Sequence, residues 1–243
     1  MSNIIFDLAI VGGMGPEATN LLFGRILKLT MATKDQEHLT IIIFNLSTMP
    51  DRSISETPKN EIEFIINLIL NSNAKYAVIA CNSFHRFASH FQHQSFMLID
   101  MITSTTNYIR RLSLDKIMLL ASSVTVNQNL YMKSDSNLMS ELFYPRIEMQ
   151  NMIDGVIKKV KDTSSRNLTS LAIDLLNIMD KTGFDHFLVS CTELSLLTEE
   201  LRSLSNYTII DSLDVAAIES IISVNSEKLN IVEARKLLPH FTI

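Results

Sequence analysis

Two cysteines are the residues of this 243-residue chain whose surroundings suggest chemistry. Each ends an apolar run and precedes small polar residues: Ala77–Ala80 leads to Cys81-Asn82-Ser83, and Phe187–Ser190 leads to Cys191-Thr192-Glu193. Small amide and hydroxyl residues are typical of helix starts, where free backbone N–H groups create a positive potential. That potential favours the thiolate form of a cysteine and suits the carboxylate of an anionic substrate. We therefore predict that each cysteine lies where thiols ionise and anions bind.

A pair of such cysteines supports chemistry that one alone does not. If two thiols face opposite sides of a carbon acid, one thiolate removes a proton while the other thiol delivers one, which inverts the centre. The simpler interpretation is that each cysteine is a small buried core residue. Neither cysteine has a CxxC or metal-ligand spacing, so the sequence favours neither a disulfide framework nor a metal site.

The rest of the chain alternates short apolar runs with longer amphipathic segments. The runs predict strands at Ile4–Val11, Thr40–Phe44, Tyr76–Ala80, Phe96–Ile99, Lys116–Leu120, Arg146–Glu148, His186–Val189 and Tyr207–Ile210. The amphipathic segments predict helices at Glu17–Leu29, Asn60–Leu70, Met101–Leu112, Asp154–Lys161, Leu168–Met179 and Leu213–Ser223, and the polar segment Lys133–Ser140 predicts a loop. This alternation is typical of an α/β fold with parallel sheets.

The order of these segments repeats within the chain. The strand before Gly12-Gly13-Met14-Gly15 corresponds to the strand before Ala121-Ser122-Ser123-Val124. The apolar run before Cys81 corresponds to the run before Cys191, and the two pairs are separated by nearly the same number of residues. Chance similarity between short β–α units is the alternative explanation. A duplication predicts two pseudo-symmetric domains, each a mainly parallel sheet flanked by helices, that present both cysteines to one crevice beyond the carboxyl ends of the strands. We expect one domain from residues 1–100 plus 211–243, and the other from residues 101–210.

The composition of the chain bears on three questions: whether it binds nucleic acid, whether it binds membranes, and where in the cell it is found. The 21 basic and 26 acidic residues give a net charge of −5, which disfavours a nucleic-acid partner. No apolar stretch is long enough to span a bilayer, and the start Ile4–Val11 contains Asp7 and lacks the basic leader of a signal peptide. We therefore expect a cytoplasmic protein that does not bind membranes.

These residues resemble the cofactor-independent aspartate/glutamate racemase family over nearly the whole chain. The start Gly12–Thr19 is similar to the family's GGMGPxAT, and Met49–Arg52 to its P-D-R loop. The two cysteine motifs resemble the family's CNTxH and GCTEL, and Leu119–Ser122 with Thr125 and Tyr131 resembles LLATxGT…Y. Gln150, Lys161 and Asp211-Ser212 fall where the family has Q, K and D-S.

The resemblance implies a dimeric enzyme that racemises an acidic amino acid with neither pyridoxal phosphate nor metal. It makes Cys81 and Cys191 the two acid/base thiols. It assigns substrate binding to Met14, Arg52, Asn82, Ser83, Ser122, Thr125, Lys161 and Thr192, with Arg52 and Lys161 on the side-chain carboxylate. The roles of two further residues stay open. His85 either tunes the thiol or hydrogen-bonds a backbone carbonyl. Glu193 either orients a thiol, a loop or the substrate ammonium, or caps a helix, which is the role that we favour.

Three departures from the family pattern bear on substrate choice: Phe84 and Ser190 beside the cysteines, and Val124 in the LLATxGT segment. Other functions remain open. A racemase of broad specificity, a one-cysteine isomerase or decarboxylase, and an inactive amino-acid-binding protein share the motifs in part. Gly13–Ala18 also fits the dinucleotide fingerprint G-x-G-x-x-A, but the run Thr40–Phe44 ends in Asn45 and lacks the expected acidic ribose partner.

Overall fold

Two parallel sheets with the same strand order form the frame of the molecule. A computed structural model describes residues 5–49, 57–112, 114–164, 166–239 and 241–242. The first sheet has the order β2-β1-β3-β4 and the second the order β6-β5-β7-β8, with every pair parallel. The strands are β1 (Leu8–Gly12), β2 (Ile41–Asn45), β3 (Tyr76–Ile79), β4 (Met97–Ile99), β5 (Ile117–Ala121), β6 (Leu142–Phe143), β7 (His186–Ser190) and β8 (Thr208–Asp211). This arrangement confirms the predicted α/β fold with two similar halves.

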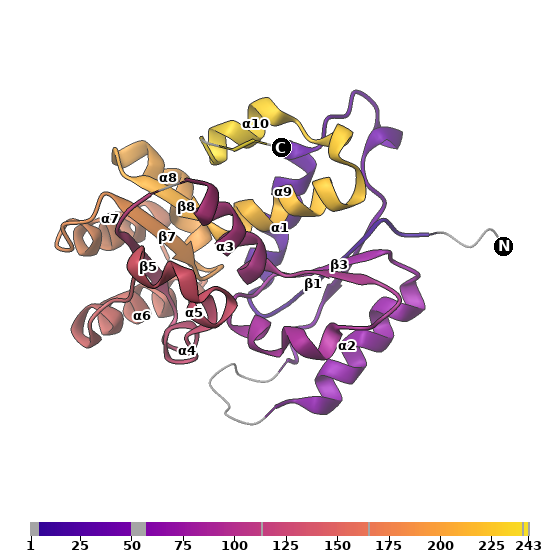
Figure 1. The fold of residues 1–243 in the computed structure, drawn as a ribbon, viewed down its shortest axis with the longest axis horizontal. Coiled ribbons are helices and arrows are strands. Elements are labelled where there is room, and N and C mark those ends of the chain that lie inside the picture. Colours follow the sequence, from indigo (N-terminus) through magenta and orange to yellow (C-terminus); the bar gives the residue numbers. More distant parts are fainter. Residues whose placement is uncertain (1–4, 50–56, 113, 165, 240, 243) are drawn as a thin grey trace.

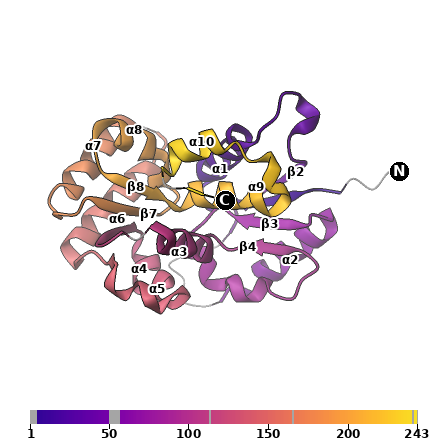
Figure 2. The ribbon, with the colours of Figure 1, turned by 45° about the horizontal axis from the view of Figure 1, so that its top comes forward.

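Helices cover both faces of each sheet, and several lie between the two halves (Figures 1 and 2). The helices are α1 (Pro16–Leu29), α2 (Lys59–Ser72), α3 (Met101–Leu112), α4 (Ser123–Asn127), α5 (Leu130–Ser134), α6 (Ile147–Lys161), α7 (Leu168–Met179), α8 (Thr198–Leu204), α9 (Ser212–Asn225) and α10 (Ile231–Leu237). Short 3-10 helices occur at η1 (Asp35–Glu37), η2 (Ser83–Phe91), η3 (Ser136–Ser140), η4 (Leu194–Leu197) and η5 (Ser226–Lys228). The domain boundaries at residues 100 and 211 stay a prediction.

One hydrophobic core joins the two sheets. It contains β1 and β5 side chains such as Ile10 and Leu119 together with apolar residues of α1, α3 and α9, among them Ile26, Ile109 and Ile218. Separate clusters fill the outer faces, one between the first sheet, α2 and η2, and one between the second sheet, α6 and α7. The shared core fixes the relative position of the halves, because burying apolar surface on all three helices stabilises the junction.

Two expectations about local structure are wrong. The segment Arg146–Glu148 is not a strand, because α6 begins at Ile147 and buries Ile153, Val156, Ile157 and Val160 at helical spacing. The edge strand is instead β6, whose two residues are too few to show an alternating pattern. The polar segment 133–140 is not a simple loop but contains the end of α5 and the 3-10 helix η3.

The turn after β1 needs its glycines for close packing. A Cβ atom on Gly12 would lie 1.9 Å from Thr19 Oγ1, and Gly13 has a φ of +91° with the Leu46 backbone 2.3 Å from where a Cβ would be. Thr19 Oγ1 accepts the Gly13 N–H at 3.0 Å and so closes the turn. The glycine pattern that resembled a dinucleotide fingerprint therefore has a structural explanation within the chain.

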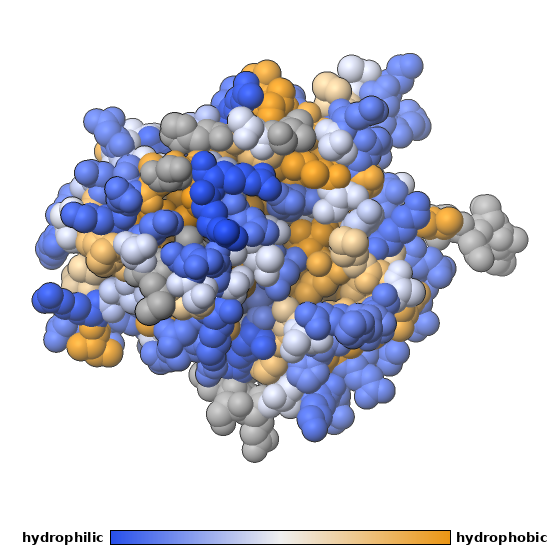
Figure 3. Space-filling view, viewed as in Figure 1, coloured by the Kyte–Doolittle hydropathy of each residue, from blue (hydrophilic) through white to orange (hydrophobic). Residues whose placement is uncertain are grey.

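The surface is mainly hydrophilic on the face drawn in Figure 3, with hydrophobic residues in separate patches. Exposed apolar side chains include Met97, which is 61% exposed on the edge strand β4, and Phe64 of α2. Among the described residues, no helix combines the length and apolar character that crossing a membrane requires. The expected homodimer stays a prediction.

Candidate active site

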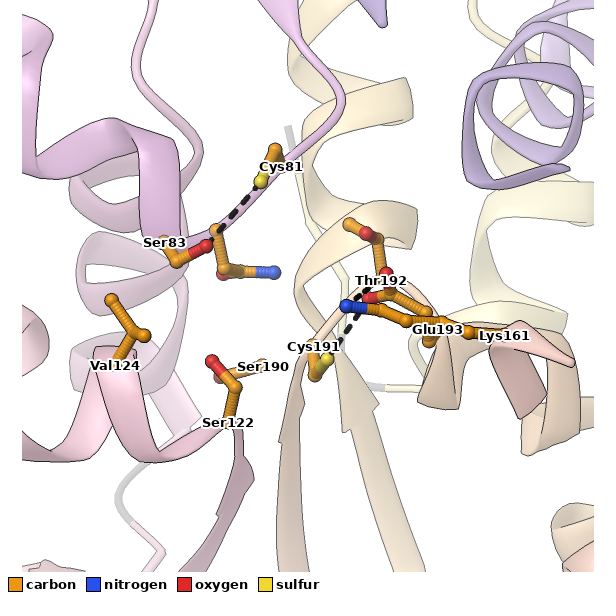
Figure 4. A pocket seen from close by; sticks show the side chains of 10 residues that line it. Cys81, Ser83, Ser122, Val124, Lys161, Ser190, Cys191, Thr192 and Glu193 are labelled. Atoms are coloured by element: carbon orange, nitrogen blue, oxygen red, sulfur yellow. Dashed lines mark hydrogen bonds and ion pairs between the residues drawn. The ribbon is translucent and has the colours of Figure 1, made fainter. Parts of the chain in front are cut away.

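The two cysteines line one cavity between the halves. Cys81 follows β3 and Cys191 follows β7, which are the corresponding strands of the two sheets. The cavity has a volume of about 90 Å³ and is lined by Cys81, Asn82, Ser83, Ser122, Val124, Lys161, Ser190, Cys191, Thr192 and Glu193 (Figure 4). Because the strands of each sheet are parallel, their carboxyl ends carry both motifs to this point.

Cys81 has polar and cationic neighbours. Its side chain is 3% exposed, and its sulfur lies 3.4 Å from the hydroxyl of Ser83, the first residue of η2. The Arg86 guanidinium interacts electrostatically with Cys81, although burial outweighs this interaction and lowers the pKa of Arg86. Arg86 also lies over the Phe87 ring, 4.5 Å from its centroid.

Cys191 has an anionic neighbour instead. Its thiol donates a hydrogen bond to Glu193 Oε2 at 3.1 Å. Burial first, and then the Glu193 carboxylate, raise the pKa of Cys191 well above its usual value, against the opposing effects of the Glu193 backbone N–H and of Lys161. Burial and Glu193 therefore oppose the Cys191 thiolate that the helix start was expected to favour.

Glu193 and Lys161 form a pair across the cavity wall. Lys161, near the end of α6, places its Nζ 3.3 Å from Glu193 Oε1. The Lys161 side chain is 45% exposed, so its ammonium group is hydrated and free to contact an entering anion. The favoured helix-cap role of Glu193 is wrong, because its side chain makes no cap hydrogen bond to η4 and instead accepts a hydrogen bond from the Cys191 thiol. Cys191, Glu193 and Lys161 thus form a thiol–carboxylate–ammonium chain.

Asn82 ties the Cys81 loop to the second half of the chain. Its amide Nδ2 donates to Ser212 Oγ at 3.0 Å, and its Oδ1 accepts from the Tyr131 hydroxyl at 2.8 Å. Tyr131 is fully buried on α5, and Ser212 is the first residue of α9. The amide to which the family resemblance assigned substrate binding is therefore also a structural bridge between the two halves.

His85 holds the backbone beside Cys81. Its Nε2 accepts the Met101 N–H at 3.2 Å, so the ring proton is on Nδ1, which donates to the Cys81 carbonyl at 2.8 Å. Of the two roles left open for His85, the structure supports the carbonyl bond. His85 acts on the Cys81 thiol only through the loop that it orients.

Most of the predicted site residues meet at the cavity, and a few do not. Asn82, Ser83, Ser122, Lys161, Thr192 and Glu193 line it with the two cysteines. Thr125 is buried behind Ser122, with the two hydroxyl oxygens 3.4 Å apart. Met14 is buried and lines an adjacent cavity of about 320 Å³ that shares Lys161 and Glu193 with the first. Arg52 lies outside the described residues.

The three departures from the family pattern divide between cavity and core. Val124 and Ser190 line the cavity, and the sequence did not assign either as a site residue although both adjoin its motifs. Phe84 does not line it but packs edge-on against Phe87, with ring centroids 5.4 Å apart. Val124 and Ser190 are therefore the departures that shape the space for a ligand.

Replacing Glu193 with glutamine should move the ionisation of Cys191 to lower pH. The substitution keeps the shape of the side chain but removes the charge that raises the pKa of the thiol, so the thiolate forms at lower pH. The measurement is the rate at which iodoacetamide modifies Cys191, followed by peptide mass spectrometry from about pH 6 to pH 10, a range that includes the ordinary thiol pKa of about 8.5. Cys81 in the same samples is the control. A Cys191 profile that stays fixed relative to that of Cys81 would contradict the assigned effect of Glu193.

The chemical groups of the cavity suit proton transfer at an anionic molecule. It offers two sulfurs, the Lys161 ammonium, and the hydroxyl groups of Ser83, Ser122, Ser190 and Thr192. Within the described part of the chain, no group of three or more His, Cys, Asp or Glu side chains could hold a metal ion. The cavity therefore brings together two acid/base groups and donors for a carboxylate.

Comparisons with known proteins identify the family of the chain. The family model for Asp/Glu/Hydantoin racemases matches residues 11–219. Among solved structures, an aspartate racemase from Picrophilus torridus is 24% identical, with a TM-score of 0.81 over 93% of this chain and 96% of the other. An aspartate racemase homologue from Pyrococcus horikoshii is 17% identical, with a TM-score of 0.71 over 90% of this chain and 99% of the other. A glutamate racemase isoform from Bacillus anthracis is also 17% identical, with a TM-score of 0.63 over 92% and 84%. The chain belongs to the Asp/Glu/Hydantoin racemase family and is therefore an isomerase.

Proposed function

We propose that this enzyme racemises an acidic amino acid by transferring protons between the substrate and two cysteines, without a cofactor. The observation that carries the proposal is that Cys81 and Cys191, which lie in corresponding loops of the two halves, line the same cavity. In Figure 4 they project from opposite sides of it, Cys81 from the loop after β3 and Cys191 from the end of β7. A stereocentre held between two sulfurs can lose a proton on one face and gain one on the other.

For one direction of the reaction, the proposal starts from a Cys81 thiolate and a Cys191 thiol. The Cys81 thiolate removes the α proton, and the C–H electron pair stays on the substrate as a carbanion. The Cys191 thiol, whose proton the raised pKa retains, then gives that proton to the opposite face and becomes a thiolate. This turnover leaves Cys191 as a thiolate and Cys81 as a thiol, which is the state from which the reverse direction starts.

Charge supports an acidic substrate. Lys161 supplies a partly exposed ammonium at the cavity, and Thr192 and Ser83 supply hydroxyl donors beside the two thiols. We assign the substrate side-chain carboxylate to Lys161 and Arg52, and the α-carboxylate or amino group to Asn82, Ser83 and Thr192. Met14, Ser122 and Thr125 complete the proposed binding set.

One-cysteine isomerase or decarboxylase chemistry is less well supported. Such a reaction needs a single proton donor or nucleophile and gives no reason for a second thiol with its own hydrogen-bonded carboxylate. Domain boundaries near residues 100 and 211, a homodimer and a cytoplasmic location belong to the same proposal.

Racemisation in deuterated water should label only the product during the first turnover. The thiol that delivers the proton has exchanged with solvent, whereas the removed proton stays on the other sulfur, so L-aspartate or L-glutamate should give a D product with deuterium at Cα. The measurement is chiral separation and mass spectrometry of product and recovered substrate, with no cofactor added. L-Asparagine, which has the shape of aspartate without the charge, is the matched control and should react far more slowly.

Two outcomes would count against the proposal. Equal early labelling of substrate and product would indicate one shared base instead of two. Equal rates for aspartate and asparagine would show that the side-chain carboxylate is not recognised.

A further inference from the structure

A buried arginine of the first half reaches the loop that carries Cys191. Arg25 lies on α1, and its side chain is 11% exposed. One of its nitrogens, Nη1, lies 2.8 Å from Asp211 Oδ2 and 2.9 Å from Asp214 Oδ1. Burial lowers the pKa of Arg25, but the two aspartates outweigh it and raise the pKa overall, so the guanidinium keeps its charge.

The other end of the guanidinium binds the segment that follows Cys191. Arg25 Nη2 donates to the Ser195 carbonyl at 3.2 Å and to Thr198 Oγ1 at 3.0 Å. The Ser195 N–H in turn donates to the Cys191 carbonyl at 3.2 Å. Ser195 therefore links Arg25 to the backbone of Cys191, because its carbonyl accepts from Arg25 and its N–H donates to the Cys191 carbonyl.

The start of α9 connects this loop with the one that carries Cys81. Asp211 Oδ1 accepts from Ser195 Oγ at 2.7 Å, while the next residue, Ser212, accepts from the amide of Asn82 at 3.0 Å. Asp211 and Ser212 are both fully buried. Asp211 thus contacts the loop that carries Cys191, and Ser212 contacts the loop that carries Cys81. Arg25 binds Asp211 and therefore holds the Cys191 loop.

We infer that Arg25 is a positioning residue for Cys191, one that sets the distance of this thiol from the substrate without touching the substrate itself. The inference rests on the proposed two-cysteine function. The planar guanidinium is suited to the task, since its fixed geometry presents donors to a carboxylate and to a loop at the same time. The hydrogen bonds of Arg25 go to the Cys191 loop and the start of α9, whereas the Cys81 loop is held through Asn82, which is bound by two hydroxyl groups. Loss of Arg25 should therefore affect one thiol more than the other.

An irreversible half-reaction can report the two thiols separately. Each enantiomer of threo-3-chloroaspartate should lose its α proton to the thiolate facing it. The C–H electron pair forms the Cα–Cβ double bond, chloride leaves with the C–Cl pair, and the resulting enamine tautomerises and hydrolyses to oxaloacetate and ammonium. One thiolate suffices for this elimination, so Cys81→Ser and Cys191→Ser enzymes define which enantiomer depends on which thiol.

Arg25→Met should slow elimination from the Cys191-dependent enantiomer about tenfold or more relative to its mirror image, because small displacements of a reacting group are costly. Arg25→Lys keeps the positive charge but loses the planar guanidinium, and it should shift the ratio of the two elimination rates less, in the same direction. Both rates come from one preparation, so partial unfolding cancels in their ratio. If Arg25→Met does not fold, Thr198→Val removes one Arg25 contact with little change of shape and should shift the ratio in the same direction.

The matched control is Arg202→Met. Arg202 also binds Asp214, at 2.7 Å, but its other contact is the Ile209 carbonyl and not the Cys191 loop. Its loss should lower stability and leave the enantiomer ratio within about twofold of the parent value. An unchanged ratio in Arg25→Met and Thr198→Val, or an equal shift in Arg202→Met, would overturn the inference. If the two cysteine variants themselves fail to show opposite preferences, the two-base function fails instead, so the two failures are distinguishable.

Discussion

Replacing either cysteine with serine should lower the rate of racemisation by about 10³-fold or more, within the range that a positioned acid or base contributes. A serine hydroxyl does not ionise near neutral pH, so it neither removes the α proton nor leaves an anion after delivering one. Each variant therefore loses both directions of the reversible reaction. The measurement is loss of optical rotation, or chiral separation over time, starting from each enantiomer of aspartate.

The elimination assay supplies the control for these variants. Cys81→Ser should retain elimination from one enantiomer of threo-3-chloroaspartate, and Cys191→Ser should retain it from the other. Retained elimination shows that the variant is folded and binds its substrate. Undiminished racemisation in either variant would rule out the assignment of both cysteines as acid/base groups.

Replacing Asp211 with alanine should lower the free energy of unfolding by about 3–5 kcal/mol, as expected when a buried ion pair loses one member. The substitution leaves Arg25 buried with one carboxylate fewer, and it removes the acceptor of Ser195 Oγ. It also removes the cap of α9, because Asp211 Oδ1 accepts the Leu213 N–H at 2.9 Å. The measurement is urea unfolding followed by circular dichroism.

Asp174→Ala is the matched control, since it breaks an ion pair that lies on the surface. Asp174 and Lys159 are 3.0 Å apart, and their side chains are 43% and 63% exposed. Its loss should cost about 0–1 kcal/mol, as is usual for exposed pairs. Similar losses in the two variants would mean that the Asp211 cluster contributes no more than an ordinary surface contact.

The sequence predicted the parts of this molecule that follow from local pattern. The buried strands β3 and β7 contain the apolar runs Ala77–Ile79 and Phe187–Val189, and Cys81 and Cys191 each lie two residues beyond the end of such a run. Because parallel strands bring their carboxyl ends together, the meeting of Cys81 and Cys191 at one cavity could be inferred from order alone. The family's motifs then identified most of the lining residues.

The sequence did not predict contacts that depend on tertiary packing. Arg25 lies inside a helix without a motif of its own, and its partners Ser195, Thr198 and Asp211 are far away in the chain. The state of the Cys191 thiol was also missed, because burial and the nearby Glu193 carboxylate outweigh the helix start that the motif indicated. Both are properties of what the fold brings together and not of sequence neighbours.

The unequal neighbours of the two sulfurs, a guanidinium near Cys81 and a carboxylate near Cys191, have a kinetic consequence. The two enantiomers of an amino acid have equal free energies in water, so the equilibrium constant of racemisation is one. The value of kcat/KM must therefore be the same for both enantiomers. Any difference in kcat between the two enantiomers must therefore be matched by the same factor in KM. The enantiomer that turns over faster at saturation then also has the higher KM. An enzyme built from two similar halves would then work at different speeds in its two directions when substrate is abundant, and at equal speeds when it is scarce.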